Sequence, residues 1–258
     1  MIVAGCDVGT MTTKAVIVKK NSILAYDVVR TNAKPEEAAK QALDNALKKA
    51  RLSARKIKYS VCTGWGRKKV TFVNKASPEV PCFVRGVRWF LPTVRSIIDV
   101  GAQTSNIVVL NEQGKVRDSI ANDRCAAGTG KFIEIMAEAL ELDINEVGPE
   151  SLRAKKNISI SNQCVVFAES EMVSHVNKGE EVADIAGSIH QSIVNRLVSM
   201  GNRAGLIEDI CITGGVAKNS GIVKRLADSL NVKILQIPED SQIVSALGAA
   251  VIAMENRK

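Results

Sequence analysis

The sequence predicts an α/β protein built from two mixed domains of related design. The motif Asp-Val-Gly occurs at residues 7–9 and again at residues 99–101, so the chain carries an internal repeat. A Thr- or Ser-containing turn and a β-branched run follow each copy, which is typical of two strands joined by a tight turn. Amphipathic helical patterns and short strands alternate through the rest of each half. A length of 258 residues suits one large domain or two small ones.

In the first half, residues 6–18 read CDVGTMTTKAVIV and predict a strand, a glycine turn and a second strand. Residues 21–29 predict a third strand. Alanine and leucine then recur at helical spacing after Pro35, which predicts a helix over residues 36–50. Residues 56–63 predict a further strand.

The second half repeats this order. Residues 98–110 read IDVGAQTSNIVVL and predict two strands, and a third run covers residues 114–121. The remaining patterns predict helices over 131–141, 167–177, 181–203, 218–230 and 242–255, and strands over 209–213 and 232–236. We expect one domain over 1–94 and a second over 95–241, with 242–258 packing back on the first. The two domains are expected to face each other across a cleft.

The composition is that of a soluble globular protein with a formal charge of +8. Lysine and arginine are scattered along the chain, which favours a solvated basic surface over a nucleic-acid site. Aromatic residues make up only 3%, too few for a platform that stacks single-stranded bases. No apolar run approaches the roughly 20 residues of a membrane helix. The N-terminus lacks the features of a signal peptide, so we expect a cytoplasmic protein with no membrane or nucleic-acid partner.

The first hairpin turn combines groups that bind an anion and a metal. Gly9 lets backbone amides approach a phosphate closely, and the threonine hydroxyls add donors. Asp7 could hold hydrated Mg²⁺, which prefers oxygen ligands. Lys14 either reaches a phosphate or is solvated. The predicted nucleotide contacts of this hairpin are Gly9, Thr10, Met11, Thr12, Thr13 and Lys14.

The second hairpin repeats this chemistry with Asp99, and two such hairpins from opposed domains would clamp a triphosphate. Its predicted nucleotide contacts are Gly101, Ala102, Gln103 and Thr104. The predicted catalytic residues are Asp7, Asp99 and Gln103, with both carboxylates acting through Mg²⁺ and Gln103 orienting water. A third element, a strand followed by Gly214-Gly215 and a helix start, suits a nucleoside and its phosphates. Gly214, Gly215, Val216 and Asn219 are its predicted contacts.

Together the three elements resemble the phosphate-1, phosphate-2 and adenosine motifs of the ASKHA superfamily of actin, Hsp70 and sugar kinases. The resemblance implies duplicated RNase H-like domains around a nucleotide cleft. Longer motifs narrow it: CTGWGR at 62–67, NDRCAAGTGKF at 122–132, NQCVVFAESEMVSH at 162–175 and TGGVAKN at 213–219. These resemble the activators of 2-hydroxyacyl-CoA dehydratases, the ATPase subunits of benzoyl-CoA reductase and the reductases of double-cubane cluster proteins.

Five of the six cysteines fall into two groups, and Cys82 stays ambiguous. Cys6, Cys62 and Cys211 lie in strand-like runs and are expected in the core, while Cys82 follows Pro81 in a predicted turn. Cys125 and Cys164 precede predicted helix starts, where the helix dipole favours a thiolate. On the residues alone, these two could be core cysteines, zinc ligands or ligands of an iron–sulfur cluster.

The resemblance implies iron: one 4Fe-4S cluster per homodimer, held by Cys125 and Cys164 of each subunit. Gly128, Thr129, Gly130 and Lys131 would line the bound ATP or ADP. ATP hydrolysis would drive one low-potential electron into a partner iron–sulfur protein, either a dehydratase or a double-cubane cluster protein. Ferredoxin or flavodoxin would be the donor, and an exposed cluster would be oxygen-sensitive.

The second hairpin departs from the family pattern, which usually reads Gly-Gly-Gln-Asp with a lysine shortly after. Here Ala102, Thr104 and Asn106 occupy these places, which puts the hydrolytic apparatus in doubt. A small sugar or acyl kinase of the same fold and a non-redox ATPase stay open as alternatives. Both histidines are expected to be surface or satisfied helix residues. Trp65 and Arg67 suit either loop packing or a partner contact.

Overall fold

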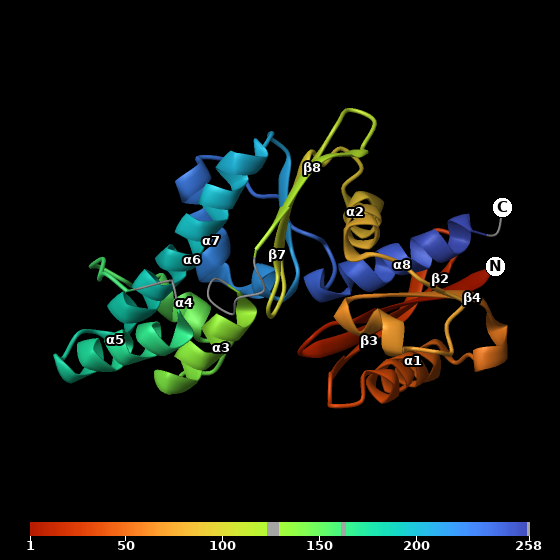
Figure 1. Ribbon diagram of the computed structural model, residues 1–258, viewed down its shortest axis with the longest axis horizontal. Coiled ribbons are helices and arrows are strands. Elements are labelled where there is room, and N and C mark those ends of the chain that lie inside the picture. Colours follow the sequence, from red (N-terminus) through yellow and green to blue (C-terminus); the bar gives the residue numbers. More distant parts are fainter. Residues whose placement is uncertain (123–128, 161–163, 257–258) are drawn as a thin grey trace. The chain divides into compact units, whose positions relative to one another are not determined.

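The computed structural model describes residues 1–122, 129–160 and 164–256. The chain divides into two compact units. Unit 1 comprises Met1–Thr93 with Ile237–Lys258, and unit 2 comprises Val94–Gln236 (Figure 1). No helix in the described ranges is long and apolar enough to cross a bilayer.

Unit 1 contains a five-stranded sheet with the order β3-β2-β1-β4-β5. Strands β1 (Ile2–Val8), β2 (Thr12–Lys19) and β3 (Ser22–Arg30) form an antiparallel meander. Strands β4 (Ile57–Thr63) and β5 (Lys75–Ala76) add to the β1 side in parallel. Consecutive residues of β1 and β2 are buried, and because successive side chains point to opposite faces of a sheet, both faces are covered at these central strands.

A different layer of helices covers each face. Helix α1 (Pro35–Ala50) packs its alanines against Cys6, Val8 and the alternate residues of β2. Helix α8 (Val244–Glu255) packs against Val3 and Val61 on the opposite face, and α2 (Glu79–Phe90) packs against α8. The C-terminal segment is therefore part of unit 1, although about 140 residues of unit 2 separate it from α2 in the sequence.

Unit 2 has the same strand arrangement. Strands β6 (Ser96–Val100), β7 (Ser105–Leu110) and β8 (Val116–Ala121) form the antiparallel meander, and β9 (Ile210–Thr213) pairs with β6 in parallel. Leu235 adds a single parallel bridge to Cys211 beyond β9. The two sheets share one topology, as the repeated Asp-Val-Gly motif predicts.

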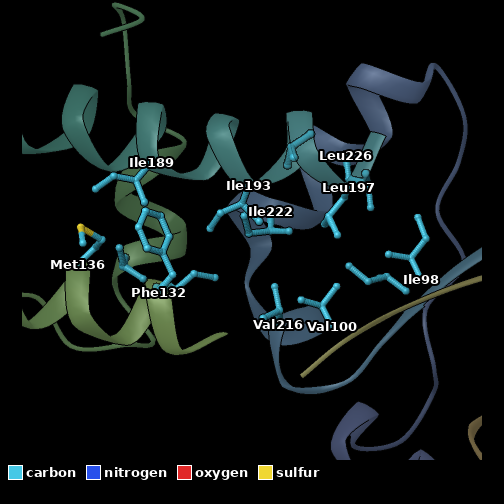
Figure 2. Packing of buried hydrophobic residues seen from close by; sticks show 14 of the residues in the cluster. Ile98, Val100, Phe132, Met136, Ile189, Ile193, Leu197, Val216, Ile222 and Leu226 are labelled. Carbon is cyan, nitrogen blue, oxygen red and sulfur yellow. The ribbon is translucent and has the colours of Figure 1, made fainter. Parts of the chain in front are cut away.

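Five helices of unit 2 build its core on one face of the sheet. They are α3 (Gly130–Ala139), α4 (Val147–Ser151), α5 (Val165–Asn177), α6 (Val182–Ala204) and α7 (Ser220–Leu230). Figure 2 shows Ile189 of α6 beside Phe132 of α3, while Ile193 lies beside Ile222 of α7. Helix α6 is thus the element against which the other helices of the unit pack.

Two predicted elements are wrong. Residues 232–236 are not a strand, because only the bridge at Leu235 forms. Cys82 does not lie in a turn but is buried within α2. Pro81 does not indicate a turn there, because it lies in the first turn of α2, where the N–H that proline lacks would have no partner within the helix. The helical pattern of α2 itself was not predicted, nor was the short α4.

Candidate functional site

The two Asp-Val-Gly hairpins adopt the same turn. In unit 1 the Gly9 amide donates to the Thr12 carbonyl at 3.1 Å, and in unit 2 the Gly101 amide donates to the Thr104 carbonyl at 2.8 Å. Each turn follows directly on the last residue of a buried strand, β1 or β6. The predicted repeat in sequence is therefore a repeat in local geometry.

The charges behind the two turns differ. Asp7 faces Lys14 across the β1–β2 pair, and their Oδ2 and Nζ atoms lie 3.1 Å apart with both side chains almost buried. Lys14 Nζ also donates to the Thr12 carbonyl at 3.2 Å, so it is held at the turn rather than solvated. In unit 2 the residue that faces Asp99 is Asn106, whose Nδ2 lies 3.5 Å from Asp99 Oδ2. The family departure at residue 106 therefore falls on the counterpart of Lys14.

The hydroxyl of Thr13 stabilises the first turn from inside the protein. Thr31 Oγ1 donates to the Gly9 carbonyl at 2.9 Å, and Thr13 Oγ1 lies 2.8 Å from Thr31 Oγ1. Because the Thr31 proton goes to Gly9, Thr13 is the donor in that pair. Thr13 is fully buried, whereas Thr10, Met11 and Thr12 are half-buried. Thr31 was not singled out in the sequence, where nothing links it to residue 9.

A second pair of turns follows the parallel strands. Asp7 is aligned with Thr63 of β4, and Asp99 is aligned with Thr213 of β9. Gly64 and Gly214 come next, both with φ of +87°. A Cβ on Gly64 would overlap the Val8 carbonyl, and a Cβ on Gly214 would overlap the Val100 carbonyl. Carboxyl ends of parallel strands thus carry both an Asp and a glycine turn in each unit, the usual place for a ligand in α/β sheets.

The unit 1 turn at Gly64 is therefore the counterpart of the predicted adenosine turn at Gly214. The paired Thr-Gly sequences at 63–64 and 213–214 are the signal that could have shown this. Arg67 Nη1 donates to the Gly64 carbonyl at 2.9 Å and lies 3.6 Å from a Glu79 carboxylate oxygen, so it supports the turn. Trp65 is 60% exposed.

The start of α3 lies directly on the second hairpin. The amides of Gly130 and Lys131 donate to the carbonyls of Gly101 and Ala102, both at 2.9 Å, and Thr129 Oγ1 donates to Ala102 at 2.7 Å. These amides hold the hairpin in place. Gly130 also lies close to the adenosine turn, because a Cβ there would be 3.3 Å from Val216 Cγ2. The structure thus brings the second hairpin, residues 129–131 and the Gly214–Val216 turn together within unit 2.

Two other predicted nucleotide contacts, Gln103 and Asn219, have different surroundings. Gln103 is exposed at the tip of its hairpin. Asn219 caps α7, because its Oδ1 accepts from the Ile222 amide at 3.0 Å, and its Nδ2 lies 3.2 Å from His190 Nε2. Gly128 and Cys125 lie outside the described residues.

The described cysteines separate as predicted. Cys6, Cys62 and Cys211 are fully buried. Burial, with a smaller contribution from Asp7, raises the pKa of Cys6 to about 12, and burial followed by the Asp99 charge raises that of Cys211 to about 12. Cys164 is partly buried and precedes the first residue of α5 as its N-cap. Within the described ranges, no group of three or more His, Cys, Asp or Glu side chains could hold a metal ion.

Comparison with known proteins decides the family. The family model described as "BadF/BadG/BcrA/BcrD ATPase family" matches residues 4–253. The chain belongs to this ATPase family. It is 35% identical over 258 residues to the 2-hydroxyisocaproyl-CoA dehydratase activator of Clostridioides difficile, covering 100% of this chain and 97% of that protein. It is 37% identical over 256 residues to the activator of lactoyl-CoA dehydratase of Anaerotignum propionicum, covering 99% and 98%.

Solved structures confirm the fold class. The Clostridium difficile activator with bound ADPNP superposes with a TM-score of 0.93 at 36% identity, covering 99% of this chain and 95% of that one. A ROK family glucokinase from Streptomyces griseus matches with a TM-score of 0.58 at 13% identity, covering 99% and 100%, which shows the shared fold alone. The ASKHA fold of this family member is therefore the predicted one, and its relatives are activating ATPases of the predicted class.

Proposed function

We propose that this family member hydrolyses ATP to drive one electron at a time into a partner iron–sulfur protein of the 2-hydroxyacyl-CoA dehydratase or double-cubane type. Support comes from the relatives, which are named activators of such dehydratases at about the same length as this chain. The double-cubane alternative rests on the sequence motifs and on the altered second hairpin.

The glycine turn that follows Asp7 and the one that follows Asp99 each offer groups that would bind nucleotide phosphates. The turn amides and the hydroxyls of Thr10 and Thr12 offer donors to phosphates, and Lys14 offers a positive charge held beside Asp7. Asp7 and Asp99 would bind Mg²⁺ through water, and the exposed Gln103 would orient the attacking water. Gly214–Val216 would receive the nucleoside. The relative with bound ADPNP supports nucleotide binding by this fold.

One observation carries the redox half of the proposal: of the five described cysteines, Cys164 is the one that is not fully buried, and it lies at a helix N-terminus. Thiolates at such a position are stabilised by the helix dipole. The neighbouring Val166 and Phe167 are each 66% exposed, which suits a surface that a second subunit covers. Cys164 and Cys125 of two subunits would supply the four thiolates that a cubane cluster needs.

Cys125 and Cys164 of the two subunits would hold the 4Fe-4S cluster, which would supply one-electron transfer between reduced ferredoxin or flavodoxin and the partner protein. The chain's own residues position ATP, Mg²⁺ and water, so that ATP and water become ADP and phosphate. Nucleotide-dependent movement of α3 and α5 would couple the two processes.

Purification without oxygen tests this proposal. We expect a brown dimer with iron and sulfide near four of each per dimer and with ATPase activity. Cys164→Ala should lose the iron and the electron transfer but keep nucleotide binding. Cys82→Ala, at a buried cysteine, should keep the iron, the electron transfer and nucleotide binding. Zinc in place of iron, or a Cys164→Ala protein that still reduces its partner, would contradict the redox role and favour a kinase or a non-redox ATPase.

A further inference from the structure

His190 is a buried histidine whose surroundings fix its protonation. It lies in α6 with no exposed surface. Asn219 Oδ1 accepts from the Ile222 amide, so the Asn219 group that faces His190 Nε2 is the NH₂. An NH₂ only donates, and His190 Nε2 is therefore an acceptor. The imidazole is neutral and carries its proton on Nδ1, which has no hydrogen-bond partner among the described residues.

Two glycines make room for this pair. A Cβ on Gly221 of α7 would lie 2.8 Å from His190 Nδ1, and a Cβ on Gly148 of α4 would lie 3.0 Å from Asn219 Oδ1. The first distance is shorter than real side chains show, and the second is tighter than most; a Cβ on Gly221 would lie even closer to Ser151 Oγ. Three helices therefore converge on the histidine and the asparagine.

Asn219 connects the contact to the adenosine turn. Its backbone amide donates to the Val216 carbonyl at 2.9 Å, and its side chain caps the N-terminus of α7. Among the residues that the structure describes, its carboxamide oxygen accepts from the Ile222 amide and its nitrogen faces His190. Removing the acceptor at His190 would release the carboxamide to rotate and would loosen the residues that follow Gly214 and Gly215.

The same helix holds the segment that leads toward Cys164. Asp184 Oδ1 accepts from the Lys155 and Lys156 amides at 2.6 and 2.9 Å. Ser188 Oγ accepts from the Ile158 amide at 2.7 Å. Asp184, Ser188 and His190 lie within two turns of α6, and Ile189 packs against Phe132 between them (Figure 2). A close-packed helix transmits a displacement rather than absorbing it.

We propose that His190 is a positioning residue that orients Asn219 and the adenosine turn, and that α6 links this turn to residues 155–158. The inference rests on the proposed nucleotide site and adds the element that couples it to the region of Cys164. A histidine that served only to fill the core would need no acceptor on Nε2, so an apolar residue of similar size would replace it without effect on the nucleotide.

Measurements of nucleotide affinity test the first part of the proposal, that His190 orients Asn219 and the adenosine turn. His190→Gln places an amide oxygen near the Nε2 position, whereas His190→Leu removes the acceptor. We expect His190→Leu to raise the ADP dissociation constant and the ATP KM roughly fivefold, the value of one hydrogen bond, with kcat little changed. His190→Gln should stay within twofold, as should the control His175→Leu in α5. Equal affinity in wild type and His190→Leu, or equal defects in the Leu and Gln variants, would overturn the proposal.

Hydrogen exchange of the full chain tests the second half, and it does not depend on bound iron. Saturating ADP should slow exchange of the Lys155, Lys156 and Ile158 amides in the wild type and in His175→Leu, but not in His190→Leu or Ser188→Ala. An ADP effect of wild-type size in both latter variants, or none in the wild type, would overturn the link through α6. If the wild-type protein bound no ADP at all, that result would contradict the proposed function rather than the link through α6.

Discussion

Gly64 and Gly214 occupy equivalent turns in the two units, and at both positions a side chain would be strained. Both have a left-handed φ, and both lie against the carbonyl of the valine that ends the neighbouring strand. Gly179 has a similar φ of +77° but no atom within 4 Å of its missing Cβ. The three positions separate the cost of backbone conformation from the cost of close approach.

We predict that Gly64→Ala and Gly214→Ala each lower the free energy of unfolding by about 3 kcal/mol, because a strained φ and displacement of a strand carbonyl add together. Gly179→Ala should cost about 1 kcal/mol, the conformational part alone. Urea denaturation of the three variants measures this. Equal losses at all three positions would show that close approach contributes nothing.

The pKa of His190 gives a second residue-scale prediction. Burial, and then the charge of Arg225, lowers this pKa to about 3 from an ordinary 6.5. Below pH 6.5 the unfolded chain binds a proton that the folded protein does not, so stability falls by about 1.4 kcal/mol for each pH unit down toward pH 3. Above pH 6.5 the two states bind equally and this effect vanishes.

Unfolding at pH 7.5 and pH 5.5 checks the sign. The wild type should lose about 1.4 kcal/mol more than His190→Gln between these two values. His175→Gln serves as the control and should lose as much as the wild type. If His190→Gln lost stability as steeply as the wild type, the histidine would not remain neutral in the folded protein.

At the scale of elements, the sequence predicted the helices and strands whose bounds depend on local sequence pattern. Helices α1 and α6 lie within a few residues of their expected bounds, because each has a strong apolar period. Helix α5 and the strands of the meanders also lie within a few residues of their expected bounds. The region 232–236 shows the limit. Val232 and Ile234 pack against the core of unit 2, while Leu235 forms a single bridge with Cys211. Tertiary packing, not local preference, decides such short runs.

The β1–β2 hairpin gives an element-scale prediction. Lys14→Met should lower the free energy of unfolding by about 2 kcal/mol, because it leaves the nearly buried Asp7 carboxylate without its charge partner. The control is Lys49→Met: Lys49 pairs with Asp27 at 2.7 Å, but its side chain is 58% exposed, and the loss should be under about 1 kcal/mol. Thermal and urea unfolding compare the two. Equal effects would mean that solvent screens the Asp7 pair as fully as the surface pair.

At the scale of the whole molecule, motifs predicted more of the site than composition could. Asp7, Asp99 and Gly214 could be named as candidates because strand ends and glycines have local signatures. Thr31 and His190 could not, since each contacts a residue 22 or 29 positions away in the chain. A single sequence carries no mark of such contacts. The domain boundary and the roles of the individual nucleotide contacts stay predictions.

The assembly gives the last prediction. In a two-fold dimer that pools Cys164 thiols, Phe167 lies one helical turn from the shared centre, and its 66% exposed ring would be covered. Phe167→Glu would bury a carboxylate near its own symmetry mate, a cost of several kcal/mol, and should convert the dimer to a monomer. Light scattering coupled to gel filtration measures the mass. Trp65→Glu changes a similarly exposed aromatic residue of unit 1 and should stay dimeric. A dimeric Phe167→Glu protein, or a monomeric Trp65→Glu protein, would place the subunit contact away from α5 and remove the means by which two chains could share four thiolates.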